Sequence, residues 1–125
     1  MADIITPKRG FSKNEFEERV SKAQKIMHEY KLDVIFVTTP HNIRYFTGFD
    51  SQFWESPTRP WFVVIPAEGK PIAVIPEIGE PGMKSTWIED VRTWKAPNPK
   101  DDGISLLSST LKPLAKRFGK IGTEL

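Results

Sequence analysis

The chain has 125 residues and nearly balanced charge, with 18 Lys and Arg residues against 16 Asp and Glu residues. Hydrophobic residues make up 38% and charged residues 27%, a composition typical of one folded domain. No run of Lys or Arg exceeds two residues, and no apolar run approaches the roughly 18 residues of a membrane span or the apolar core of a signal peptide. These features argue against nucleic-acid and membrane partners and favour the cytoplasm, and the absence of cysteine excludes disulfides and thiolate chemistry.

A long helix is predicted from Ser12 to about Tyr30. Ser12 and Glu15 have the spacing of a capping box, which satisfies two free amides at a helix start. One apolar stripe at helical spacing consists of Phe16, Val20, Ala23, Met27 and Tyr30. His28 falls on the same helix, where a surface or partly packed role is favoured over catalysis.

Three apolar runs follow and predict strands. Residues 33–38, DVIFVT, are typical of a strand covered on both faces. Residues 61–66 and 71–76 are joined by Ala-Glu-Gly-Lys and predict a hairpin, in which Gly69 supplies a positive φ. The prolines of this hairpin stand at the strand ends, where a missing amide matters least.

The second half of the chain alternates between helix and strand patterns. Residues 77–87 predict a short helix carrying Met83 and Trp87, residues 91–95 an outer strand, and residues 120–125 a last strand. Because a hairpin and crossover connections coexist, the order predicts an α/β domain with a mixed sheet.

A further helix is predicted between the last two strands. Asp101 or Asp102 is expected to cap it, and Pro113 should kink it or break it near Thr110. Its buried stripe is expected to consist of Ile104, Leu107, Leu111, Leu114 and Phe118, with Gly119 as the stop.

The stretch from His41 to Pro66, HNIRYFTGFDSQFWESPTRPWFVVIP, contains large aromatic residues in a segment without helical or strand period before its final strand. Irregular segments usually lie at the surface, whereas large aromatics usually do not. Phe53, Trp54 and Arg59 therefore require an explanation. Tyr45 and Phe46 are expected in the core.

Two smaller residues of this stretch have local explanations. Asn42 is predicted to occupy a turn, where its side chain bonds its own backbone. Gly48 is predicted to meet a backbone requirement that other residues would not.

Self-sufficient catalytic chemistry is not evident in the sequence. Its two histidines, His28 and His41, belong to no cluster with metal-ligand spacing, and G-x-G-x-x-G, Walker and G-x-S-x-G motifs are absent. The adjacent acids Asp101 and Asp102 are better explained as helix caps. No catalytic or metal-binding residue is predicted within the chain.

The segment from Asn42 to Phe49, N-I-R-Y-F-T-G-F, resembles the N-x-x-Y-L/F-T-G-F signature of creatinase/prolidase-type proteins, the Xaa-Pro peptidases and their amidinohydrolase relatives. Other parts resemble the same family in order. Glu17-Glu18-Arg19 is similar to its opening helix motif, residues 33–38 and the hairpin to its strands, and I-G-T-E-L to its I-G-x-E strand. The resemblance spans the whole chain.

The resemblance implies that residues 1–125 form the amino-terminal domain of such a protein, a three-layer α/β domain with a mixed sheet flanked by helices. The catalytic "pita-bread" domain would then lie beyond Leu125 and be absent from this chain. In peptidase members that domain holds two divalent metal ions, Mn²⁺ or Co²⁺, whereas creatinase holds none. No cofactor is expected in residues 1–125.

The resemblance also implies partners. Family members form homodimers, in which the amino-terminal domain of one subunit covers the active site of the other. By position, Phe53 or Trp54 and Arg59 match residues that contact a small peptide or small amide substrate across the dimer. An arginine suits that role because its planar fork can bind a carboxylate through two hydrogen bonds.

The leading hypothesis is a non-catalytic dimerisation and substrate-pocket domain of a metal-dependent Xaa-Pro dipeptidase. Within the same family, a creatinase-like amidinohydrolase or related C–N hydrolase is the alternative. An interpretation from another class is a free-standing α/β module that binds a peptide or protein through the Phe53–Arg59 loop. The coding sequence after Leu125 distinguishes these hypotheses.

Overall fold

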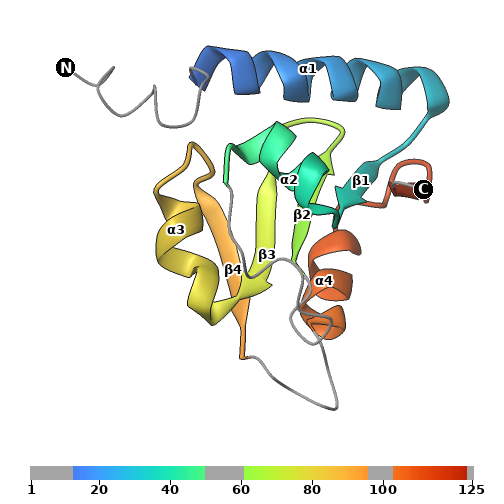
Figure 1. The fold of residues 1–125 in the computed structure, drawn as a ribbon. Coiled ribbons are helices and arrows are strands. Elements are labelled where there is room, and N and C mark those ends of the chain that lie inside the picture. The colour runs from blue at the N-terminus through green and yellow to red at the C-terminus, as the bar shows by residue number, and fades with distance from the viewer. Residues whose placement is uncertain (1–12, 50–60, 96–102, 124–125) are drawn as a thin grey trace.

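The computed structural model of the protein describes residues 13–49, 61–95 and 103–123, and Figure 1 shows their arrangement. A five-stranded sheet lies between helices on both faces, so the domain is a three-layer α/β structure with a mixed sheet, as predicted. The strands are β1 (Val34–Val37), β2 (Phe62–Pro66), β3 (Ile72–Pro76), β4 (Asp90–Trp94) and β5 (Ile121–Thr123). The helices are α1 (Lys13–Tyr30), α2 (Pro40–Thr47), the 3₁₀ turn η4 (Glu77–Gly79), α3 (Glu80–Lys84) and α4 (Ile104–Leu111).

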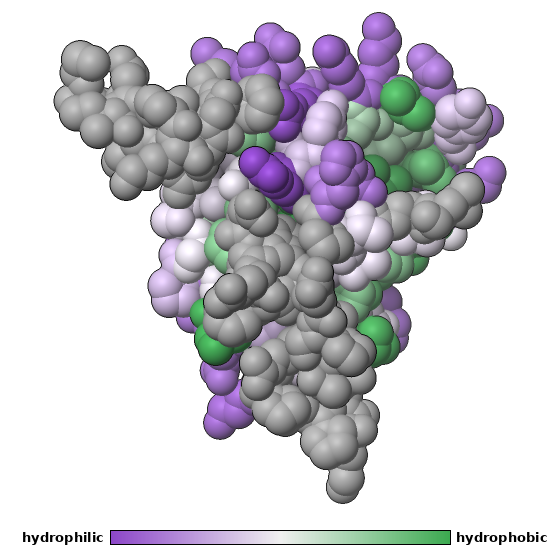
Figure 2. Space-filling view, viewed as in Figure 1, coloured by the Kyte–Doolittle hydropathy of each residue, from purple (hydrophilic) through white to green (hydrophobic). Residues whose placement is uncertain are grey.

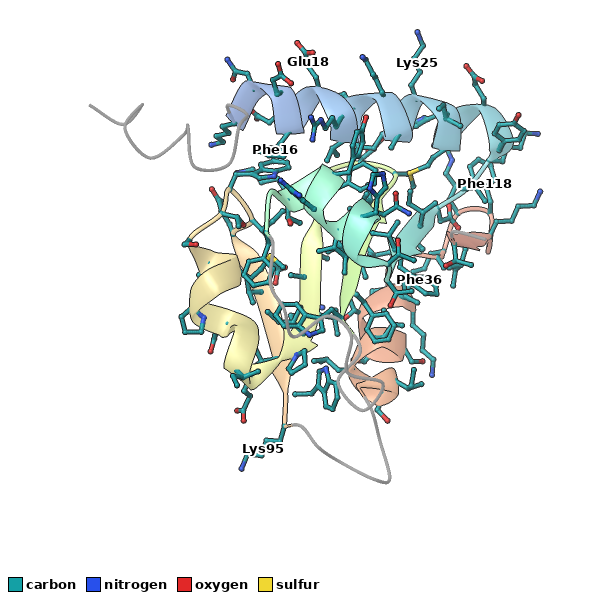
Figure 3. The ribbon with its side chains drawn as sticks, in the orientation of Figure 1. Phe16, Glu18, Lys25, Phe36, Lys95 and Phe118 are labelled. Atoms are coloured by element: carbon teal, nitrogen blue, oxygen red, sulfur yellow. The ribbon has the colours of Figure 1, made fainter. Side chains whose placement is uncertain are left out.

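The strands of the sheet have the order β4-β3-β2-β1-β5, and four of them run in the same direction. Strand β2 pairs antiparallel with β1 and β3, while β3 is parallel to β4 and β1 is parallel to β5. The four strands other than β2 therefore end at one edge, where β2 begins. We call this the carboxyl edge; Lys95, which follows β4, marks it in Figure 3.

The two faces of the sheet are covered differently. On the first face, α1, α2 and α3 contribute Met27, Ile43 and Met83 to one core with alternate residues of the strands, and we call it the helix-rich face. On the second, α4 is the one described helix that contributes buried residues, Leu107 and Leu111, and we call it the single-helix face. All five residues of β2 and of β3 are buried, which confirms that the hairpin strands are covered on both sides.

Helix α1 confirms the prediction of a long amphipathic helix, with one correction at its end. Phe16 points toward the sheet, whereas Glu18 and Lys25 point away from it (Figure 3). Tyr30 is exposed rather than part of the buried stripe. Lys31 has a left-handed φ of 58° that turns the chain toward β1, so Leu32 packs against the core instead. Ser12 of the predicted capping box lies outside the described residues.

Helix α2 contradicts the prediction that the stretch after the first strand has no regular structure. Its apolar period was missed because eight residues are too short for a clear pattern. Thr39 is the extended N-cap residue before Pro40, and Gly48, at φ 81°, ends the helix by donating its N–H to Arg44 O at 2.8 Å. The backbone requirement predicted for Gly48 is thus confirmed.

The helix also corrects two assignments within the stretch. Asn42 lies inside α2 and not in a turn. Phe46 is buried as expected, but Tyr45 is exposed on the outer side, where its ring lies against the guanidinium of Arg19 at 4.4 Å. Arg19 also donates to Tyr45 O at 2.7 Å, which fastens α2 to α1.

Helix α4 ends at Leu111, which confirms that Pro113 breaks the pattern near Thr110. The predicted buried stripe was too long. Leu107 and Leu111 are buried, whereas Ile104 in the first turn and Phe118 beyond the break are exposed. The residue at the N-cap is Gly103, at φ 87°, while the predicted caps Asp101 and Asp102 lie outside the described residues.

The remaining elements lie near their predicted places, with one correction. The hairpin of β2 and β3 turns through Gly69 at φ 99°, and β4 is an outer strand. The short helical segment carries a buried Met83 but ends at Lys84, so Trp87 lies after it and not on it. β5 is the predicted last strand. None of the helices in the described ranges has the length and apolar character needed to cross a membrane.

Candidate functional site

The three predicted substrate-facing residues, Phe53, Trp54 and Arg59, lie outside the described residues. The structure does describe the residues on either side of them. Phe49 follows α2 and Trp61 immediately precedes β2 at the carboxyl edge. The site can therefore be built from the two positions between which residues 50–60 run.

Phe49 and Trp61 are stacked on each other. Their ring centroids are 5.1 Å apart with an interplanar angle of 19°, and Trp61 is only 2% exposed. Such a pair adds about 0.5–1.5 kcal/mol beyond the area that it buries. The two described residues that border residues 50–60 therefore lie side by side.

Two glycines of the helical segment that follows β3 pack directly against the two stacked rings. A Cβ atom on Gly79 would lie 2.1 Å from Trp61 Cη2, and one on Gly82 would lie 2.5 Å from Phe49 Cε1. Both distances are far shorter than ordinary carbon–carbon contact, so only glycine lets the rings approach η4 and α3 this closely. Two glycines three residues apart in a helical segment were the sequence signal for this packing, and the sequence reasoning missed it.

The end of α2 is held by buried hydrogen bonds. The hydroxyl of Thr47, which is fully buried, donates to Ile43 O at 2.7 Å and accepts from Phe49 N at 3.0 Å. The indole N–H of Trp87 donates to Phe46 O at 2.8 Å. These bonds satisfy the last turn of the helix and set the direction in which the chain leaves it.

A second segment is bounded at the same edge. Trp94 ends β4 and is buried, and a Cβ atom on Gly103 would lie 2.6 Å from its Nε1. Residues 96–102 therefore also begin and end at the carboxyl edge. In open α/β sheets, ligands bind outside the carboxyl ends of the strands. This edge is accordingly the candidate site.

The described residues at this edge include no group of side chains arranged for acid–base catalysis or metal binding. His28 lies away from this edge, with Nε2 3.2 Å from Ala67 O, and His41 is exposed on α2. Over residues 13–49, 61–95 and 103–123, no three His, Asp or Glu side chains are grouped so that they could hold a metal ion. The metal pair that the resemblance implies belongs to the domain expected beyond Leu125, and no reaction step is assigned through it.

The buried carboxylate of Asp33 has a structural role at the opposite end of β1. Asp33 is buried, and its Oδ2 accepts hydrogen bonds from Phe118 N at 2.8 Å and Gly119 N at 2.7 Å. It borders a cavity of about 370 Å³ that His28 and Arg117 also line. The Asp33 carboxylate therefore fixes the turn before β5.

The sequence of the chain matches the model of a known protein family. The profile of the creatinase/prolidase N-terminal domain matches residues 19–125, and the chain belongs to that family. A search of curated protein sequences finds no significant match.

Solved structures share the fold at low identity. A dipeptidase, PepE, from Mycobacterium ulcerans is 20% identical, with a TM-score of 0.66 over 90% of this chain and 35% of its own. A dipeptidase from Pyrococcus horikoshii is 21% identical, with a TM-score of 0.66 over 85% of this chain and 28% of its own. The creatinase/prolidase N-terminal domain of an X-Pro dipeptidase from Streptococcus pyogenes is 12% identical, with a TM-score of 0.62 over 85% of this chain and 92% of its own. The chain thus spans about a third of the two longer dipeptidases and nearly all of the isolated domain.

Proposed function

We propose that this chain is the non-catalytic amino-terminal domain of a larger hydrolase, an Xaa-Pro dipeptidase, in which it shapes the substrate pocket and the dimer. A catalytic domain with two divalent metal ions follows residue 125 in this proposal. The observation that carries it is the family match over residues 19–125, together with structural neighbours that are dipeptidases or their amino-terminal domains.

The chemistry of the described residues supports a non-catalytic role. The carboxyl edge presents stacked aromatic rings and backbone, and the described ranges contain no group of acidic and histidine side chains that could hold a metal ion. Such a platform can position a loop and exclude water, but it cannot activate a nucleophile.

Within this proposal, Phe53, Trp54 and Arg59 reach a partner subunit's active site in a homodimer. The Phe49–Trp61 stack supports the assignment because it gives residues 50–60 a rigid base. A rigid base lowers the entropy lost when a loop docks, which improves binding without new contacts. Arg59 would bind the carboxylate of a small peptide, and the aromatic residues would cover its apolar side.

The first test uses the coding sequence and the purified chain. The gene is expected to continue beyond Leu125 into a domain with paired Asp and Glu metal ligands. The 125-residue chain alone should show no turnover of a Gly-Pro dipeptide with added Mn²⁺ or Co²⁺, whereas the longer protein should cleave it. Turnover by the 125-residue chain would contradict the proposal, and a gene that ends at Leu125 would favour the free-standing binding module.

The second test addresses the loop in the longer protein. Trp54→Ala and Arg59→Ala should each raise KM or lower kcat for the dipeptide and leave the melting temperature nearly unchanged, because they act on substrate and not on the core. Arg117→Ala removes an exposed arginine elsewhere and is the matched control. Wild-type kinetics in both loop variants would show that the assignment is wrong.

Assays of the longer protein with different substrates decide the substrate class. Hydrolysis of creatine or another small amide in place of Gly-Pro would establish the amidinohydrolase or related C–N hydrolase alternative. The non-catalytic role of residues 1–125 would stand in either case.

A further inference from the structure

A cavity of about 370 Å³ lies at the edge of the sheet opposite the carboxyl edge, and we call it the amino-edge cavity. Its lining comes from three segments, within residues 28–33, 66–68 and 113–118. Figure 3 shows Phe118 below the C-terminal end of α1, and Figure 2 shows hydrophobic surface between hydrophilic residues near that end. Cavities of this size accommodate small molecules.

Charged side chains of both signs line the amino-edge cavity, namely Lys31, Asp33, Glu68 and Arg117. The larger hollow on the single-helix face differs in this respect. It is an apolar groove of about 440 Å³ between α4 and β5, lined mainly by Leu107, Leu111 and Ile121. A ligand of the amino-edge cavity has to match charge as well as shape.

Asp33 provides the buried charge of the cavity. It is only 5% exposed, and its Oδ2 accepts the two backbone N–H bonds of the turn before β5. Its Oδ1 accepts no hydrogen bond from the described residues and is not fully enclosed by protein. Because a buried carboxylate oxygen without a donor costs free energy, such an oxygen is normally satisfied by a ligand, an ion or water.

An ammonium group suits this oxygen better than a metal ion. His28 and Glu68 line the same cavity as Asp33, but within the described ranges no three His, Asp or Glu side chains are close enough together to hold a metal. An ammonium group needs no such cage, because it carries its own hydrogen-bond donors and one acceptor of opposite charge already binds it well.

Lys31 provides an opposite charge at the mouth of the cavity. It is exposed at the end of α1 and forms an ion pair with neither Asp33 nor Glu68. Arg117 is placed differently, because its guanidinium carbon lies 5.0 Å from the centre of the Phe118 ring and so forms part of the wall. A ligand that carries both charges can therefore bridge Asp33 and Lys31, which do not neutralise each other.

The rest of the wall is apolar. Leu32, Pro113, Leu114 and Phe118 line it, and Phe118 is 42% exposed although it is a large aromatic side chain. Covering such surface is favourable in proportion to the apolar area removed from water. The wall therefore favours a ligand with an apolar side chain.

We propose that the amino-edge cavity binds a small zwitterion with an apolar side chain, whose ammonium group donates to Asp33 Oδ1 and whose carboxylate pairs with Lys31. Free α-amino acids and short peptides share this chemistry. The inference does not rest on the proposed function, because the cavity is lined by residues of this chain and lies at the opposite edge of the sheet from the candidate site.

An NMR titration of the isotope-labelled 125-residue chain with L-leucine tests the proposal. The amide signals of Leu32, Phe118 and Gly119 should shift and saturate, whereas those of Phe49 and Trp61 at the carboxyl edge should stay unchanged. The absence of saturable shifts at the cavity would overturn the inference.

Two analogues of leucine test the need for both charges without altering the protein. Isoamylamine lacks the carboxylate and isocaproate lacks the ammonium group. Each should bind about tenfold or more weakly than leucine, because each loses one charged interaction. An analogue that binds as tightly as leucine would overturn the proposal, since one of the two contacts would then be absent.

Protein variants test the two assigned residues. Lys31→Gln should weaken leucine binding about threefold to fivefold, as expected for an exposed charge pair. Lys25→Gln is the matched control, because Lys25 points away from the sheet on the same helix (Figure 3), and it should bind leucine like wild type. Equal affinities of these two variants would overturn the role of Lys31.

Asp33→Asn should cause the larger loss, because it replaces the buried negative charge. The same NMR spectra report whether the turn before β5 is retained in this variant. If the turn is lost, the analogues and the Lys31→Gln comparison still decide the proposal.

The dipeptide Leu-Gly distinguishes the two sources of the zwitterion. Tighter binding of leucine would identify a site for free amino acids, and tighter binding of Leu-Gly a site for short peptides. Because no arm of the experiment measures peptidase activity, failure of this inference and failure of the proposed function are separate results.

Discussion

The two faces of the sheet bury their strands equally well but are covered by very different amounts of helix. Val63 and Ile65 face α1, α2 and α3, whereas Val64 and Val74 face α4, and all four are fully buried. Among the described helices, the eight-residue α4 is the one that contributes buried residues to the core of the second face. The difference appears only at the margin, where Ile104 and Ile121 are exposed.

The two faces also differ in the features that they carry. The helix-rich face carries the Phe49–Trp61 stack and the hydrogen bonds that fix the end of α2, so the candidate site is built on the rigid side. The single-helix face carries the open groove, and among the described residues β5 pairs with β1 alone. The predictions below test whether the two faces differ energetically as their cover suggests.

Removing the ring at the base of the candidate site should have the largest effect. Trp61→Ala is expected to lower the free energy of unfolding by about 3–5 kcal/mol, because it deletes a buried aromatic side chain and the ring on which Phe49 stacks. Denaturant unfolding measures the loss, and Trp61→Phe should recover part of it. A loss below about 1 kcal/mol would show that the stack is not part of the stable core.

Matched truncations compare the two cores directly. Ile75→Ala, on the helix-rich face, should cost about 3–5 kcal/mol, and Leu111→Ala, on the single-helix face, about 2–3 kcal/mol. The cost grows with the cavity that remains, and the groove beside Leu111 lets its surroundings relax. Equal losses in denaturant unfolding would remove the energetic difference between the faces.

Adding a methyl group at Gly79, which packs against Trp61, should lower the stability of the fold. Gly79→Ala is expected to destabilise the fold by about 1–3 kcal/mol, because its Cβ would collide with Trp61. Combining it with Trp61→Phe, which withdraws the colliding ring, should give a total loss smaller than the sum of the two single losses. Strict additivity would indicate that the two positions do not meet.

The smallest effect is expected from a surface pair that belongs to neither core. Lys70 Nζ donates to Glu89 Oε1 at 3.0 Å, and this hydrogen bond with the charge of Lys70 holds the pKa of Glu89 below its ordinary value. A depressed pKa contributes stability above the unfolded-state pKa, and that stability is lost as the pH falls through the folded-state pKa. The melting temperature of wild type should exceed that of Glu89→Gln slightly at about pH 7, and the difference should disappear once the pH has fallen below the folded-state pKa of Glu89.

A difference that persists or grows in acid would contradict this sign. Added salt should also reduce it near neutral pH, because both side chains are exposed and screened. The pair thus gives a control for surface electrostatics against the core substitutions.

Most of the architecture was predictable because its signals are local and repetitive. The long stripe of α1, the apolar runs of β1, β2 and β3, and the positive φ of Gly69 follow from spacing and residue type. Helix α2 was missed because its eight residues carry too few apolar positions to show a period. The motif from Asn42 to Phe49 is enough by itself to indicate the family.

The candidate site was predictable only as a region. Phe49 and Trp61 are 12 positions apart in sequence, and nothing local shows that their rings stack. The contact depends on where α2 ends, on the register that starts β2, and on a helical segment whose glycines leave room for both rings. Phe53, Trp54 and Arg59 remain predictions.

The sequence by itself determined the α/β class, the order of the strands, and membership of the creatinase/prolidase N-terminal family. These properties follow from residue periodicity and from short motifs, which act between neighbours in the chain. Only the tertiary structure decided that Tyr30, Ile104 and Phe118 are exposed, that Asp33 fixes the turn before β5, and that one face of the sheet keeps an open groove. Burial depends on which distant segments meet, and that is set when the sheet assembles and not by any single segment.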